Sequence, residues 1–414
     1  MALIVQKYGG SSVANVERIK NVALNIAKNR TNNKIVVVVS ALGDTTDELI
    51  SLAKQINPKP SSREMDMLLA TGEQVSIALL AMALDAINVP VISFTGPQVG
   101  IITDNVHTKA RIKEIKTNRI DTVLSENKVV IVAGFQGKTP ENEITTLGRG
   151  GSDTTAVALA AALGADLCEI YTDVEGVYTA DPRIVTNASK LKRISYDEML
   201  ELASLGAKVL HPRSVELAKL YNVPLCVRSS FINKEGTLVV ENTLMEKEVV
   251  VTGIAHDLNV AKIGLFDVPD QPGIASIIFN ALAKANINID MIIQSAMRNN
   301  INDIAFTIPK DDLDKALEIA NNVAKEIDIS EIVFDDDVAK ISIVGAGMIS
   351  SPGVAAKMFN ILARENINIE MISTSEIKVS CIIKTKDVSK AVQVLHEGFE
   401  LDKITDQQQN KTLA

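Results

Sequence analysis

Apolar residues in the first 230 positions alternate between short continuous runs and longer stretches with helical spacing. The runs are rich in Val and Ile and lie at 2–8, 34–41, 89–94, 128–135, 166–172 and 224–230. Such runs are typical of strands buried on both faces of a parallel sheet. Helices are predicted at 13–29, 44–57, 62–87, 154–163, 196–205 and 213–221. This alternation predicts an α/β domain with a mainly parallel sheet.

The pattern changes near residue 249, where an internal repeat begins. VAKI occurs at 260–263 and again at 338–341, and NINIDMI at 286–292 returns as NINIEMI at 366–372. Each copy reads strand, helix, strand, strand, helix, strand. The sequence therefore predicts two ferredoxin-like βαββαβ domains after the α/β domain.

The composition narrows the class of protein. The chain has 414 residues, enough for two or three domains, and 46% of them are hydrophobic. Its net charge of −9 argues against a nucleic-acid surface, and no apolar run approaches the length of a membrane span. Three scattered cysteines and four scattered histidines predict neither a zinc site nor a disulfide framework. Without a signal-peptide pattern at the N-terminus, we expect a soluble, cytoplasmic protein.

The stretch TTLGRGGSDTT at 145–155 is a Gly-rich turn that opens a predicted helix. Ser152 is predicted to be the N-cap of that helix, and Gly164 its stop. The N–H groups and the dipole of a helix start attract anions, and Arg149 adds a positive charge. A purely structural turn explains the stretch equally well.

Two further turns follow predicted strands, KYGGSS at 7–12 and SALGDTTDEL at 40–49. Ligands of parallel sheets bind at the carboxyl ends of the strands, where Lys7 and Ser40 fall. The alternatives are a lysine that only reaches solvent and helix capping by Thr45 or Thr46. No Walker A motif is present.

Glu73 lies in an almost wholly apolar stretch, LLATGEQVSIALL. Its burial costs free energy unless a cation such as a substrate ammonium group compensates, although a capping role is the simpler explanation. Charged residues of both signs also punctuate two loop regions, at 172–183 and 205–213. These loops suit nucleotide phosphates and ribose, or they are ordinary turns.

Six motifs together resemble those of aspartokinases: KYGGSS, SALGDTTDE, REMDMLLATGEQVS, TTLGRGGSDTTA, YTDVEGVYTADPR and GAKVLHPR. They occur in the order and approximate spacing of that family, and the resemblance covers residues 2–400. It implies a three-layer α/β sandwich of the amino-acid-kinase type at 1–245. It also implies a first ACT domain at 259–335 inserted into a second, formed by 246–258 and 336–403, before a polar tail at 404–414.

The resemblance implies an aspartate kinase that phosphorylates the side-chain carboxylate of L-aspartate with ATP, giving 4-phospho-L-aspartate. This is the first step of lysine, threonine and methionine biosynthesis. A carboxylate is already an anion at neutral pH and needs no general base, so catalysis consists of positioning and charge neutralisation. Mg²⁺ is expected on the ATP phosphates, with no dedicated protein ligands.

The family match also implies roles for individual residues. Lys7 would neutralise the transferring phosphoryl group, with Asp153 orienting it. Arg149 would hold the α-carboxylate of aspartate, and Glu73 its α-ammonium group. The implied substrate residues are Ser40, Thr46, Glu73, Arg149 and Ser152, and the implied ATP residues are Lys7, Gly9, Gly10, Ser11, Thr172, Asp173, Tyr178, Arg183 and Lys208.

For the ACT domains the resemblance implies feedback inhibition by lysine, with threonine as co-effector or alternative. It also implies a homodimer or a dimer of dimers. The implied allosteric residues are Asp267, Gly273, Ile274, Asn288, Ile289, Asp290 and Gln294, with Asp290 facing the amino group of the effector. Asp290 alternatively only caps a strand.

Two other functions stay open. The first is a kinase for another acidic metabolite, such as glutamate or N-acetylglutamate, which would not need the Glu73 and Arg149 pair. The second is an amino-acid sensor with an inactive kinase half, against which the presence of Lys7, Asp153 and Lys208 argues. A fused dehydrogenase is not expected, because only a polar stretch follows residue 400.

Overall fold

A computed structural model describes residues 1–206, 209–241, 249–297, 299–327 and 329–404. The chain forms two compact units. The first unit comprises Met1–Val177, Lys190–Ser204 and Lys208–Met245, and the second comprises Tyr178–Ser189, Leu205–Ala207 and Glu246–Ala414. Two short segments inside the predicted range 1–245 therefore pack with the C-terminal half.

The first unit is built on an eight-stranded sheet in the order β10-β12-β11-β9-β1-β2-β6-β3. Only β12 runs antiparallel to its neighbour β11 in this sheet, which confirms the mainly parallel prediction. The strands are β1 (Ala2–Tyr8), β2 (Asn33–Val39), β3 (Val91–Phe94), β6 (Val129–Ala133), β9 (Leu167–Thr172), β10 (Arg193–Ser195), β11 (Leu225–Ser229) and β12 (Thr237–Val240). Every residue from Ile35 to Val39 is buried, as the continuous apolar run predicts.

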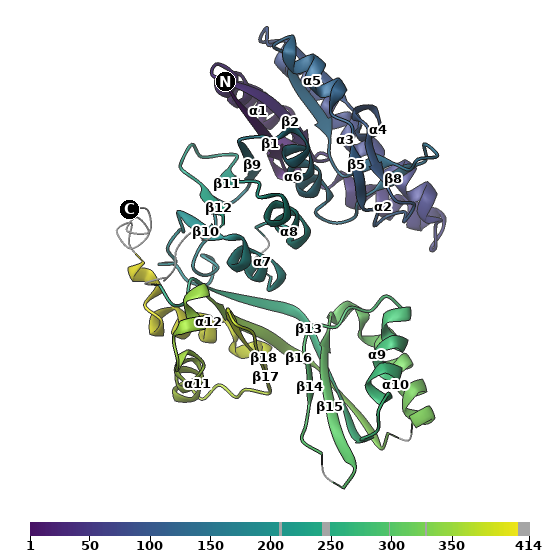
Figure 1. The fold of residues 1–414 in the computed structure, drawn as a ribbon, viewed down its shortest axis with the longest axis vertical. Helices are drawn as coiled ribbons and strands as arrows, with labels where there is room; N and C mark the ends of the chain where they lie inside the picture. The colour runs from purple at the N-terminus through teal and green to yellow at the C-terminus, as the bar shows by residue number, and fades with distance from the viewer. Residues whose placement is uncertain (207–208, 242–248, 298, 328, 405–414) are drawn as a thin grey trace. The chain divides into compact units, whose positions relative to one another are not determined.

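Helices cover both faces of this sheet, which gives the three layers. The helices are α1 (Val16–Arg30), α2 (Thr45–Ile56), α3 (Ser62–Asp85), α4 (Gly96–Val99), α5 (Asn118–Ser125), α6 (Gly151–Leu163), α7 (Tyr196–Ser204) and α8 (Pro212–Tyr221) (Figure 1). Tyr8 packs with α1 and α3 on one face, whereas its neighbour Lys7 reaches α6 on the other. By length and composition alone α3 could cross a membrane, but it packs against α1, β3 and β8.

A small second sheet in the first unit has the order β5-β4-β7-β8. Its strands are β4 (Ile101–Thr103), β5 (Ile112–Ile115), β7 (Gln136–Lys138) and β8 (Ile144–Thr146). The sequence pattern did not predict these strands, because three or four residues are too few to show a periodicity. The sheet matters for the site, because β8 packs against α3 and leads directly into the turn that carries Arg149.

The second unit is one six-stranded sheet that contains both repeats, in the order β14-β15-β13-β16-β18-β17. The strands are β13 (Gly253–Pro269), β14 (Ile292–Gln294), β15 (Ile301–Ile308), β16 (Glu331–Val344), β17 (Met371–Thr374) and β18 (Lys378–Lys384). The long strands β13 and β16 run through both repeats. The start of β13, from Gly253 to Asp257, pairs with the end of β16 and supplies the fourth strand of the second repeat.

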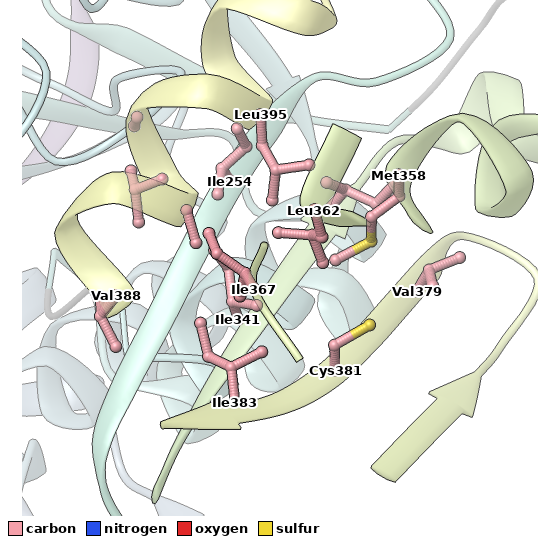
Figure 2. Close-up of a cluster of buried hydrophobic side chains, with 14 of the residues drawn as sticks. Ile254, Ile341, Met358, Leu362, Ile367, Val379, Cys381, Ile383, Val388 and Leu395 are labelled. Atoms are coloured by element: carbon pink, nitrogen blue, oxygen red, sulfur yellow. The ribbon is translucent and has the colours of Figure 1, made fainter. Parts of the chain in front are cut away.

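Each repeat has two helices on its part of the sheet. The first repeat has α9 (Ile274–Lys284) and α10 (Leu313–Ile327), and the second has α11 (Val354–Arg364) and α12 (Val388–Gly398) (Figure 1). Figure 2 shows the core of the second repeat, where Met358 and Leu362 of α11 meet strand residues such as Ile341. The predicted βαββαβ architecture is confirmed in both copies.

The segment 178–189 joins the core of the second repeat. Ala180 and Val185 are buried among its apolar side chains. The Thr179 hydroxyl lies 2.9 Å from Nε2 of buried His396 on α12, and the carbonyl oxygen of Thr179 accepts from the N–H of Ile254 at 2.8 Å. The second half of the predicted nucleotide loop 172–183 therefore packs with the second repeat.

The two repeats contact each other through residues at equivalent positions of the two copies. Met291 and Met371 occupy equivalent positions, and both lie in one small apolar cluster between the repeats. Around it, Lys262 of the first repeat pairs with Glu370 of the second, and Lys340 of the second pairs with Asp290 of the first. In each repeat, one lysine thus pairs with an acidic residue of the other repeat.

Candidate active site

The ends of neighbouring parallel strands place the first catalytic candidate. Lys7 is paired in register with Val38 of β2 and Ile170 of β9, near the carboxyl end of β1. Its ammonium group lies 2.6 Å from Oδ1 of Asp153 on α6, and the two side chains are 12% and 13% exposed. The structure therefore brings together the two residues predicted to act on the phosphoryl group.

The turn after β1 interlocks with the turn after β2. The N–H of Ser40 donates to the carbonyl of Tyr8, and that of Gly43 to the carbonyl of Gly10, both at 3.1 Å. A Cβ at Gly10 would lie 2.9 Å from the Gly43 carbonyl oxygen, so this position requires glycine. Gly9 lies close to the Lys7 ammonium group, and Ser11 is exposed beside it.

The turn before α6 differs from the prediction in one respect. The N-cap is Gly150 in the left-handed region, with φ of +69°, and Ser152 lies buried within the first turn of the helix. The prediction that Ser152 is the N-cap is therefore wrong. A Cβ at Gly150 would collide with the ring of His211, so only glycine allows this close approach. Gly164 ends the helix in the left-handed region as predicted, with φ of +60°.

Arg149 stands on this turn with its side chain exposed. Within the described part of the chain it forms no hydrogen bond or ion pair, so its guanidinium group is available to an anion. The turn itself is anchored: Arg213 donates to the carbonyl of Leu147 at 3.0 Å. Burial lowers the pKa of His211, which packs against Gly150, so this ring is neutral at pH 7.

Glu73 on α3 is buried, with 3% of its surface exposed. Its Oε1 accepts from the N–H of Ala41 at 3.1 Å, and its Oε2 is buried with no partner among the described residues. Burial raises the pKa of Glu73 to about 7. Gly72 permits this closeness, since a Cβ there would lie 2.9 Å from that of Ala41. A buried carboxylate with a free oxygen is suited to a cationic ligand.

The remaining substrate candidates flank that contact. Ser40 follows β2 directly and precedes Ala41, which donates to Glu73. Thr46 lies half-buried in the first turn of α2, whose N-cap is Asp44 and not either threonine. The adjacent Thr45 hydroxyl donates to the carbonyl of Leu42, which holds this turn in place.

The nucleotide candidates divide between the two units. Thr172 ends β9 in the first unit and donates to Asp173 at 3.0 Å. Tyr178 and Arg183 belong to the second unit, where Arg183 forms a bidentate pair with Asp181. Lys208 lies outside the described residues.

The allosteric candidates lie in the first repeat. Asp267, with φ of +55°, accepts from Ser330, and Gly273 caps α9 with φ of +100°, directly before Ile274. Asp290 already faces an ammonium group, that of Lys340. The other candidates are at least partly exposed near β14, and they are Asn288, Ile289 and Gln294.

In the first unit, sequence reasoning overlooked one buried residue on the helix of Glu73, Asp66. It lies two helical turns before Glu73 on α3 and is fully buried. The signal was present in the motif REMDMLLATGE, where two acids seven residues apart share one helix face. In the described part of the chain, no three His, Cys, Asp or Glu side chains gather as a metal site.

Comparison with known proteins decides the family. The amino acid kinase family model matches residues 2–229, and the ACT domain model matches 267–323 and 341–399. The aspartokinase of Corynebacterium efficiens is 53% identical over 408 residues, which cover 97% of each chain. The chain belongs to the aspartokinase family. It is therefore a kinase with two ACT regulatory domains, as the six motifs and the C-terminal repeat predicted.

Two solved structures of one aspartokinase share the fold over nearly the whole chain. Escherichia coli aspartokinase III in complex with aspartate and ADP, described as the R-state, is 26% identical with a TM-score of 0.81. The same enzyme in complex with lysine and aspartate, described as the T-state, has a TM-score of 0.76. Each alignment covers 96% of this chain and 99% of the aspartokinase III chain.

Proposed function

We propose that this aspartokinase transfers the γ-phosphoryl group of ATP to the side-chain carboxylate of L-aspartate, giving 4-phospho-L-aspartate. The observation that carries the proposal is the unpartnered Oε2 of buried Glu73. An α-ammonium group would neutralise that carboxylate, and exposed Arg149 would take the α-carboxylate through a planar two-point contact. The E. coli relative solved with aspartate and ADP supports the same substrate pair.

The catalytic task is to bring two anions together without a general base. Lys7 provides positive charge at the carboxyl end of β1, and Asp153 holds its ammonium group in place. The glycines of the β1 turn let backbone approach the phosphates, and the first N–H groups of α6 lack helical partners. These residues position both substrates and neutralise the charge that builds up between them.

The phosphate site fits a nucleotide whose Mg²⁺ arrives with it. Lys7, the glycines and the start of α6 offer N–H groups, which donate to phosphate oxygens and do not bind a metal, and the carboxylate of Asp153 is paired with Lys7. Mg²⁺ bound to ATP would shield the phosphate charge from the attacking carboxylate. Thr172, Asp173, Tyr178, Arg183 and Lys208 are proposed to hold the rest of the nucleotide.

For the ACT domains we propose lysine as the inhibitor, with threonine as co-effector. The lysine complex of E. coli aspartokinase III supports this choice. The proposed contacts are in the first repeat, where an effector amino group would compete with Lys340 for Asp290. Inhibition by the end product fits a cytoplasmic enzyme at the first step of lysine, threonine and methionine biosynthesis, assembled as a homodimer or dimer of dimers.

A coupled ADP-release assay tests the substrate. We expect turnover with L-aspartate and at most one hundredth of it with L-glutamate or N-acetyl-L-glutamate. The longer side chain of L-glutamate places its carboxylate farther from the α-carbon that Glu73 and Arg149 would hold, and N-acetyl-L-glutamate has no α-ammonium group for Glu73. The Lys7→Ala variant in the same assay separates enzyme turnover from contaminating ATPase. Equal or greater turnover with either alternative acid would disprove the substrate proposal.

Titration of the same assay with lysine and threonine, separately and together, tests the effector. Inhibition by lysine that Asp290→Asn weakens supports the proposal. Full activity at millimolar lysine with threonine present would remove it, while leaving the kinase proposal intact.

A further inference from the structure

Asp66 is a fully buried carboxylate that the phosphoryl-transfer argument does not use. Its Oδ1 accepts from the Thr146 hydroxyl at 2.5 Å and from the Thr108 N–H at 3.0 Å. Its Oδ2 lies 2.7 Å from Nδ1 of His107. A buried ionised carboxylate is stable only when donors surround it, and here the donors come from outside α3.

The donors belong to two segments that frame the Arg149 turn. His107 and Thr108 lie between β4 and β5, and Thr146 is the last residue of β8, three residues before Arg149. Asp66 itself is on α3, on the same face as Glu73 two turns later. One side chain therefore connects the helix that carries Glu73 with the turn that carries Arg149.

The backbone of Thr108 has an unusual conformation and close neighbours at this connection. Thr108 has a φ of +66°, which is uncommon for a β-branched residue, and in this conformation its N–H donates to Asp66. The Thr108 carbonyl oxygen would lie 2.9 Å from a Cβ at Gly148, the residue next to Arg149. The backbone of Thr108 thus lies between Asp66 and Gly148 of the Arg149 turn.

A second anchor holds the same two segments but not α3. Arg213 donates to the carbonyls of Leu147 and Ala110, at 3.0 and 2.9 Å. This anchor fixes the segments to each other and to α8. The Asp66 cluster joins both segments to the helix of Glu73 by buried hydrogen bonds, in addition to the packing of β8 on that helix.

We propose that Asp66 is a positioning residue that sets the separation between Glu73 and Arg149, and so tunes this enzyme for an α-amino acid with free ammonium and carboxylate groups. The inference rests on the proposed aspartate kinase function. A change of about 1 Å in such a separation lowers the productive binding of a two-point ligand by roughly tenfold to a hundredfold. Among the described residues, Lys7 and Thr172 form no hydrogen bond with Asp66, so we expect ATP binding to change much less than aspartate binding.

Thr146→Val and Thr146→Ser form the test. Valine keeps the shape of threonine but loses the hydroxyl that donates to Asp66, whereas serine keeps the hydroxyl. We expect Thr146→Val to raise the KM for aspartate about tenfold with the KM for ATP unchanged within about twofold, and Thr146→Ser to stay near the wild type. Asp66→Asn should raise the aspartate KM further, to about a hundredfold.

Thr145→Val is the matched control. Thr145 is the preceding residue of β8, is equally buried, and shares a hydroxyl contact of 2.6 Å with Thr103 without touching Asp66. Thr145→Val should lose about as much stability as Thr146→Val, but its aspartate KM should equal that of the wild type. Equal rises in aspartate KM for Thr145→Val and Thr146→Val, or an unchanged aspartate KM in Thr146→Val, would overturn the inference. Failure of the wild-type enzyme to phosphorylate aspartate would instead overturn the proposed function.

Discussion

In the first unit buried Glu73 keeps a carboxylate oxygen without a partner, whereas in the second unit buried Lys340 is paired with Asp290. The first arrangement leaves a desolvation cost that a ligand can offset. The second offsets that cost within the fold, between two copies of one repeat. A buried carboxylate without a cation thus distinguishes the proposed substrate site from the paired charges between the repeats, and each prediction below tests this contrast.

The largest effect is expected at Lys7. Lys7→Ala removes the charge that Asp153 holds near the phosphates, so kcat should fall roughly a thousandfold while the aspartate KM changes little. Steady-state kinetics in both substrates measure this. Similar small losses for Lys7→Ala and Arg149→Ala would show that neither residue has its assigned role.

Substitution of Arg149 should change the aspartate KM more than kcat. Arg149→Lys keeps the positive charge but loses the two-point contact, so the aspartate KM should rise roughly tenfold with a smaller change in kcat. Arg193→Lys, at an exposed arginine on β10, is the matched control and should behave as the wild type. An aspartate KM that is unchanged in Arg149→Lys would contradict the contact with the α-carboxylate.

Glu73 should make aspartate binding dependent on pH. Its pKa is raised to about 7 by burial, and only the ionised form attracts an ammonium group, so the aspartate KM should rise up to about tenfold per pH unit below pH 7. Initial rates between pH 5.5 and 8.5, an interval of about three units around that pKa, measure this. An aspartate KM that stays flat across this interval would contradict the assignment.

The same shift predicts a gain in stability for Glu73→Gln. A carboxyl group whose pKa is raised in the folded state destabilises that state as the pH rises from its ordinary pKa through 7. Glu73→Gln should therefore be more stable than the wild type by up to about 3 kcal/mol at pH 8, and should show no gain near pH 4. Urea unfolding at both pH values tests this.

The paired charges between the repeats provide the other half of the comparison, and the two partners should have unequal effects on stability. Asp290→Asn leaves the buried Lys340 ammonium unpaired and should cost about 3 kcal/mol, because the lysine side chain is only 4% exposed. Lys340→Met should cost less than about 1 kcal/mol, because Asp290 is 41% exposed and solvent can reach it. Urea unfolding with equal losses for the two variants would show that solvent access does not govern this pair.

Long elements were predictable because their burial repeats along the chain. The run at 34–41 became β2, and the apolar stretch around 77–84 lies inside α3. The N-cap of α6 was predicted wrongly, because the residue that adopts the cap conformation is set by the approach of His211 and not by local preference. The motif REMDMLLATGE placed Asp66 on the face of Glu73, but the hydrogen bonds of Asp66 could not be predicted, because its donors are distant in the chain.

The sequence by itself determined the family, the α/β class, the duplication and most of the candidate residues. These features reside in motif order and in periodicity, which are properties of neighbours along the chain. Only the tertiary structure decided that Gly150 is the N-cap of α6, that Glu73 has a free oxygen, and that 178–189 packs into the second repeat. Charge pairing and desolvation act through space, so they exist only once distant segments are brought together.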